Sequence, residues 1–110
     1  MNIQMNKGTL EMCVLALLER GDRYGYDITG AFNGRIDISD GTVYPVLRRL
    51  MADGMLQSYL KESSEGPPRK YYTITDSGKS FKNTLHGEWL EISKAINDLL
   101  DEEANDHDKS

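Results

Sequence analysis

The sequence has few of the residues that build covalently linked or metal-linked folds. Only Cys13 among the 110 residues is a cysteine, so one chain cannot form a disulfide or a cysteine-built zinc site. The two histidines, His86 and His107, are separated along the chain. We therefore expect no metal site, which argues against a metal-sensing protein.

Long apolar runs are also missing. No stretch approaches the roughly 20 residues that span a bilayer, and residues 1–7 lack the apolar stretch of a secretory signal. The 38% hydrophobic and 28% charged residues are ordinary for a globular chain, and the length fits one core. We expect a soluble cytoplasmic protein with no membrane partner.

Motifs of enzyme chemistry are absent as well. The sequence has no His-Glu-x-x-His, no Gly-x-x-x-x-Gly-Lys and no Gly-x-Ser-x-Gly. The glycines at 21, 25, 30 and 34 are spaced as helix boundaries and turns, not as a dinucleotide-binding loop. We expect no enzyme, no catalytic residue and no cofactor.

The negative charge is concentrated at one end of the chain. The net charge is −5, yet nine basic and nine acidic residues balance through Ile74. Six acids fall between Asp98 and Asp108, a composition typical of a solvated tail. The preceding part of the chain can therefore carry a local basic patch, and the total charge does not exclude DNA as a partner.

Three helices are predicted in the first half. Residues 10–19 are apolar almost all round, which favours a buried helix with Thr9 as its N-cap. Residues 24–32 have helical apolar spacing. A third helix follows Ser39-Asp40 and carries Pro45 near its start, where a missing amide proton is best tolerated. Its inward stripe is Val43, Val46, Leu47 and Leu50.

A hairpin and a long helix complete the chain. Segments 56–60 and 69–74 favour strands, with a loop over 61–68, and residues 36–38 are a short extended candidate. Thr75 can cap a helix over 76–100. This helix repeats apolar residues at spacings of 4, 3, 4 and 3: Leu85, Trp89, Ile92, Ile96 and Leu99. Such a seam indicates a helical partner, and a homodimer is the economical choice.

This order of elements predicts an α+β, mostly α fold, a winged helix-turn-helix with a long C-terminal dimerisation helix. We assign residues 1–75 to a DNA-binding domain, 76–100 to the dimerisation helix and 101–110 to an acidic disordered tail. In helix-turn-helix proteins the start of the recognition helix faces the DNA bases. Thr42 and Tyr44 lie off its apolar stripe, and residues 41–72 hold five bases against three acids.

Several of these residues also have plainer interpretations. Arg48 and Arg49 can be solvated helix residues, and Arg49 can pair with an internal acid. Tyr71 and Tyr72 fit strand packing, and Cys13 fits a small buried hydrophobe. Trp89, in the heptad stripe, is by default part of a dimer core.

Several motifs in order resemble the PadR family of transcriptional regulators. Residues 41–50, Gly-Thr-Val-Tyr-Pro-Val-Leu-Arg-Arg-Leu, followed by Asp53-Gly54-Met55-Leu56, are similar to its recognition-helix region. Residues 15–18 and 24–28 resemble its first two helices, and residues 66–78 resemble its wing and last cap. The resemblance covers about residues 8–100.

The resemblance implies a winged-helix homodimer that mostly represses genes by binding pseudo-palindromic operators on double-stranded DNA. A single C-terminal helix is typical of the short subfamily. Its multidrug-sensing members hold flat aromatic ligands between paired tryptophans, which implies Trp89 as an effector-binding residue. The implied DNA contacts are Tyr26, Thr42, Tyr44, Arg48, Lys61, Arg69 and Lys70. The wing tip departs from the family because Pro67 stands where a basic residue is common.

One alternative keeps the fold and changes the partner. A winged helix can also bind a protein and no DNA, and the weak basic balance and the acidic tail are compatible with such an interaction module.

Overall fold

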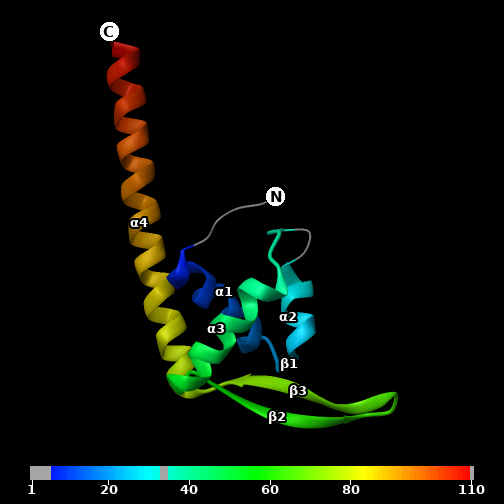
Figure 1. Cartoon of the computed structure of the whole chain (residues 1–110). Coiled ribbons are helices and arrows are strands. Elements are labelled where there is room, and N and C mark those ends of the chain that lie inside the picture. Colours follow the sequence, from blue (N-terminus) through cyan, green and yellow to red (C-terminus); the bar gives the residue numbers. More distant parts are fainter. Residues whose placement is uncertain (1–5, 33–34, 110) are drawn as a thin grey trace.

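The computed structural model describes residues 6–32 and 35–109. Three short helices gather in one cluster, a hairpin projects from it, and one long helix extends past it (Figure 1). The predicted α+β winged-helix class is confirmed. The elements in chain order are α1 (Lys7–Glu19), β1 (Arg23–Tyr24), α2 (Gly25–Phe32), α3 (Asp40–Ala52), β2 (Leu56–Ser63), β3 (Gly66–Ile74) and α4 (Asp76–Lys109).

The core lies between the three short helices and the sheet. α1 supplies Val14 and Leu15, which have no exposed surface, and α2 supplies Ile28. The inward stripe predicted for α3 is confirmed, since Val43, Val46, Leu47 and Leu50 are all buried. Leu56 on β2 and Tyr72 on β3 close the core from the sheet side.

The N-terminal cap of α1 differs from the prediction. Asn6 is the N-cap, and its side-chain oxygen accepts a hydrogen bond from the Thr9 amide at 2.8 Å. Thr9 lies inside the helix, so α1 starts about one turn earlier than its apolar run indicates. At α4 the predicted cap is confirmed, because the Gly78 amide donates to Thr75 Oγ1 at 3.0 Å.

The recognition-type helix α3 contains Pro45 rather than ending or starting on it. Pro45 is the sixth residue of this helix, past the first turn in which it was expected. Its missing amide leaves the Gly41 carbonyl without the usual i+4 donor. The helix ends at Ala52. Gly54, just past the Asp53 cap, has a φ of 77° that favours glycine, and the Met55 amide donates back to the Leu50 carbonyl at 2.8 Å.

The sheet has three strands in the order β1-β3-β2, all antiparallel neighbours. The predicted loop over 61–68 is wrong: β2 continues to Ser63 and β3 begins at Gly66, so the turn is Ser64-Glu65. The extended candidate at 36–38 is not a strand. β1 is the unpredicted third strand, and it includes Tyr24, which we had expected on the second helix.

The last helix continues further than predicted. α4 runs to Lys109, so the boundary at residue 100 and the unstructured tail after it are wrong. Residues 101–109 contain neither glycine nor proline, and their glutamates and alanine favour helix once the preceding turns are formed. At about 1.5 Å per residue, a helix of 34 residues is about 51 Å long.

None of the helices within residues 6–32 and 35–109 combines the length and the apolar composition needed to cross a membrane.

Gly78 on α4 packs against Met55, the residue before β2, and this contact leads to a stability prediction. A Cβ added at Gly78 would overlap the Met55 carbonyl oxygen and approach Ile74 Cγ1 at 2.7 Å, whereas one added at Gly87 meets nothing within 4 Å. We expect Gly78→Ala to lower stability by about 1–3 kcal/mol. Gly87→Ala, the matched control, should raise it by about 1 kcal/mol through helix propensity. Thermal unfolding followed by circular dichroism measures both, and an unchanged Tm for Gly78→Ala contradicts this packing.

Candidate functional site

The exposed side of α3 carries three of the predicted contact residues. Thr42 and Arg48 are exposed, and the Thr42 hydroxyl lies 3.2 Å from Ser39 Oγ. Tyr44 is only partly exposed, because its ring lies against Gly25, where an added Cβ would be 3.2 Å from the Tyr44 hydroxyl. Burial, followed by the Asp40 charge, raises the pKa of Tyr44. Tyr44 therefore packs α3 against the start of α2 as well as bordering the exposed surface.

The hairpin has two chemically different faces, because side chains alternate along a strand. The inner face continues the core side of the sheet and carries Tyr72, Lys70 and Leu60. Lys70 Nζ lies 5.6 Å from the centre of the Tyr72 ring. Burial raises the pKa of Tyr72, and the nearby Arg48 guanidinium opposes this rise. Lys70 and Arg48 thus approach the same tyrosine from the sheet and from α3.

The outer face carries a row of tyrosines. Tyr59, Tyr71 and Tyr24 stand opposite one another on β2, β3 and β1, with ring centres 5.8 Å and 6.1 Å apart. Tyr26 extends the row at 6.3 Å from Tyr24.

Two cations lie on this tyrosine row. Lys61 Nζ is 5.2 Å from the Tyr71 ring centre, and Arg69 Cζ is 5.0 Å from that of Tyr24. Such cation–π contacts hold the two side chains close to the sheet. The seven predicted DNA-contact residues therefore form two groups. Thr42, Tyr44, Arg48 and Lys70 lie on the α3 side, and Tyr26, Lys61 and Arg69 lie on the outer face of the sheet.

Some surface features were missed at the sequence level. The Tyr59 hydroxyl donates to Asp22 at 2.8 Å, and this hydrogen bond raises the pKa of Tyr59. Leu60 is 70% exposed on the inner face of the hairpin. The sequence does carry a signal for this, because Tyr59 and Lys61 alternate with Leu60 along β2. This alternation separates the two faces only in a strand that continues past residue 60, and the predicted strand ended there.

One buried ion pair joins α1 to α3. Arg49 Nε and Nη2 each lie 3.3 Å from Glu11 Oε1, and Glu11 is buried. The interpretation of Arg49 as a partner of an internal acid is confirmed. Arg48, its neighbour, stays on the exposed side.

The apolar seam predicted on α4 is uncovered. Trp89, Ile92, Ile96 and Leu99 are 46–64% exposed, and Leu85 is half-buried. An apolar row of this length on a single chain indicates an interaction surface.

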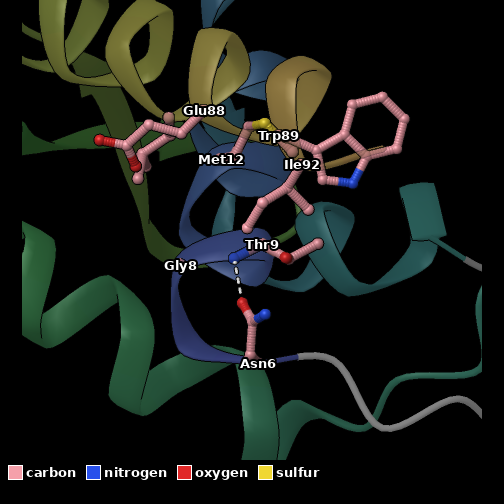
Figure 2. Close-up of a pocket in the computed structure, with 8 residues that line it drawn as sticks. Asn6, Gly8, Thr9, Met12, Glu88, Trp89 and Ile92 are labelled. Atoms are coloured by element: carbon pink, nitrogen blue, oxygen red, sulfur yellow. Dashed lines mark hydrogen bonds between the residues drawn. The ribbon is translucent and has the colours of Figure 1, made fainter. Parts of the chain in front are cut away.

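A groove runs between this row and α1. Figure 2 shows Ile92 directed toward Gly8 and Thr9, with Glu88 and the Trp89 indole on opposite sides of it. The adjoining part of the groove has a volume of about 510 Å³ and reaches Met12, Cys13, Ile36, His86 and Trp89. Cys13 is half-buried, and burial raises the pKa of its thiol.

Residues 14–84 match the transcriptional regulator PadR-like family. The chain belongs to the PadR family. It is therefore a transcriptional regulator of a DNA-binding family, and not an enzyme, as predicted.

Three PadR-family regulators are similar to this chain, one found by its sequence and two by their solved structures. The negative transcriptional regulator PadR of Bacillus subtilis (strain 168) is 31% identical over 98 residues, which cover 86% of this chain and 52% of that protein. A PadR-like regulator from Bacillus cereus is 38% identical with a TM-score of 0.77, covering 89% of this chain and 97% of that one. A PadR-family regulator from Clostridium difficile is 33% identical with a TM-score of 0.76, covering 83% and 97%.

The two hairpin faces of this PadR-family chain lead to a test with neighbouring residues. Lys70 lies on the α3 side and Arg69 on the outer face, where it contacts Tyr24. We expect Lys70→Gln to reduce the salt dependence of DNA binding by about one phosphate contact, and Arg69→Gln to reduce it less. Fluorescence anisotropy over a salt series measures both. The reverse order would place the duplex on the outer face of the sheet.

Proposed function

We propose that the chain is a homodimeric repressor that binds a pseudo-palindromic operator through two α3 helices. The observation that carries the proposal is the exposed apolar row on α4, together with the helix α3, whose Thr42 and Arg48 face solvent. The repressor sense is supported by the similar Bacillus subtilis protein, which is named a negative regulator. The proposed place of action is the cytoplasm.

Dimerisation would bury the α4 seam. Trp89, Ile92 and Ile96 lie on one stripe, so a second α4 can cover them together, and apolar burial is the main driving force of association. In a two-fold dimer the same patch serves both chains. Two α3 helices held in this way would enter successive major grooves about 34 Å apart on one side of the duplex.

DNA recognition would divide between charge and base contacts. Arg48 and Lys70 supply cations on the side of α3, and phosphate contacts of this kind supply affinity and position. Thr42, near the start of α3, would meet base edges. The tip prolines and the acids Glu62 and Glu65 add no positive charge to the wing.

An effector would bind beside Trp89, as the family resemblance implies. The groove there is lined by α1 and α4 residues, and a planar aromatic compound could stack on the half-exposed indole. Such a compound releases DNA only if it binds more tightly to the dimer state with the wrong α3 separation.

The DNA-binding proposal predicts a specific response of the intact protein. Titration into labelled DNA from upstream of its own gene, with a scrambled duplex as control, should give preferential binding with a steep salt slope. Arg48→Ala should weaken operator binding roughly tenfold and leave the dimer intact. Unchanged affinity at physiological salt would remove Arg48 from the contact surface.

The dimer proposal predicts dissociation by one seam charge. Ile92→Asp places a carboxylate where two apolar α4 faces would meet, and burying an unpaired charge is strongly unfavourable. We expect sedimentation analysis to show monomers for Ile92→Asp and dimers for the parent chain. Asn83→Asp, with the same new charge at an exposed site outside the seam, is the matched control. A variant that still sediments as a dimer argues for a different interface.

The effector proposal predicts changes in tryptophan fluorescence. Trp89 is the one tryptophan of the chain, so its emission reports directly on this site. Planar aromatic dyes should quench the tryptophan fluorescence of the parent protein and release the protein from DNA. Trp89→Phe should weaken dye binding, measured by dye anisotropy, and leave DNA binding in place. Absence of quenching in the parent protein would eliminate the site.

The interaction-module alternative is favoured by Leu60, because a side chain 70% exposed on a wing can bind another protein. A partner retained at high salt, without preferential DNA binding, would support it. Leu60→Ser would then reduce partner capture.

A further inference from the structure

The Glu11–Arg49 pair is unusual in its burial. Among the described residues, Glu11 is the charged residue that the fold buries, with a side chain 9% exposed. Its Oε1 lies 3.3 Å from both Nε and Nη2 of Arg49, whose side chain is 34% exposed. The Arg49 Nε–H therefore donates to a carboxylate oxygen inside the protein, and Nη2 of the same guanidinium lies within ion-pair distance of that oxygen.

The pair joins two elements with different tasks. Glu11 lies on α1, next to Met12 in the groove beside Trp89. Arg49 lies on α3, next to Arg48 on the exposed side. α1 is also joined to the dimer arm, because Lys82 Nζ on α4 lies 2.6 Å from Glu19 Oε2. α1 thus stands between the arm and the recognition helix, with one ion pair to each.

α1 and α3 also pack through apolar residues. Val14, Leu15, Leu47 and Leu50 share one core cluster, and hydrophobic burial is not directional. A carboxylate–guanidinium contact has directional geometry and loses its interaction if α3 turns. The pair adds little net stability, because Glu11 loses its water on burial and the attraction to the partly exposed Arg49 only offsets that cost. Its contribution here is therefore orientation.

We propose that the Glu11–Arg49 pair fixes the rotation of α3 relative to α1, and so determines how Arg48 and Thr42 meet the operator. This inference rests on the proposed DNA-binding function. Arg49 is a positioning residue rather than a phosphate contact. A displacement of α1, by the arm or by an occupant of the groove, reaches the recognition helix through this pair.

Four variants test the proposal: Glu11→Gln, Arg49→Gln, the double variant and, as control, Glu19→Gln. Glu11→Gln keeps the shape of the side chain and removes its charge. The control removes the same charge from the same helix, but from the pair that faces α4. Operator affinity, the salt slope and the Tm are measured for each full-length protein.

The expected result is the same loss of affinity from either member of the pair. Glu11→Gln and Arg49→Gln should each weaken operator binding on the order of tenfold, and the double variant should be no weaker than the worse single one. Glu11→Gln and Arg49→Gln should have the same salt slope, because each acts on Arg48 through the same pair and neither residue itself contacts phosphate. Glu19→Gln should bind as the parent does.

A second measurement needs no DNA. In the free protein, hydrogen exchange followed by mass spectrometry should show faster exchange in the α3 peptides of Glu11→Gln than in the parent. Peptides of α1 and of the first turns of α4 should stay unchanged. A purely structural role would instead speed exchange throughout the core, in step with a lower Tm.

The overturning results are distinct. If Arg49→Gln lowers the salt slope by about 0.9 while Glu11→Gln does not, Arg49 contacts phosphate and the proposal is wrong. It is equally wrong if Glu11→Gln changes neither affinity nor α3 exchange. If the parent protein binds no DNA selectively, the proposed function fails, and α3 exchange alone then decides whether the pair orients the helix.

Discussion

The structure depends on the burial of α1. This helix is apolar on almost every side, so it can pack at once against α3, β3 and α4. Leu10, Val14 and Leu15 place α3 and α4 on one common support. α3 and the hairpin both keep exposed faces, and their buried residues pack in the same core as those of α1. The regulatory arrangement therefore follows from a single hydrophobic helix.

The spacing of residues predicted the features that depend on a single helix. The α3 stripe, the Thr75 cap and the α4 seam could each be found from the sequence, because each depends on spacing along one helix. The ends of the helices were harder to predict. Asn6 caps α1 before the apolar run begins, and the acidic residues after Leu100 continue a helix whose earlier turns are already formed. These are cooperative effects that residue type alone does not encode.

Contacts between distant segments were the hardest to predict. β1 has two residues and exists only because β3 lies beside it, so no local pattern marks it. The separation of Lys61 and Arg69 from Lys70 depends on strand register. For Arg49 an internal acid was foreseen, but Glu11 as that acid follows from the packing of α1 on α3.

The acidic residues of α4 give the molecule an uneven distribution of charge. In Figure 1 the C-terminal end of α4 lies far from the hairpin, and the net charge of −5 derives from the part of the chain after Ile74. Near a polyanion such a molecule experiences a torque that turns its acidic end outward and its hairpin inward. Charges beyond the screening length, about 8 Å at physiological salt, barely weaken the bound state. An overall negative charge is therefore compatible with a DNA-binding surface at the hairpin end of the molecule.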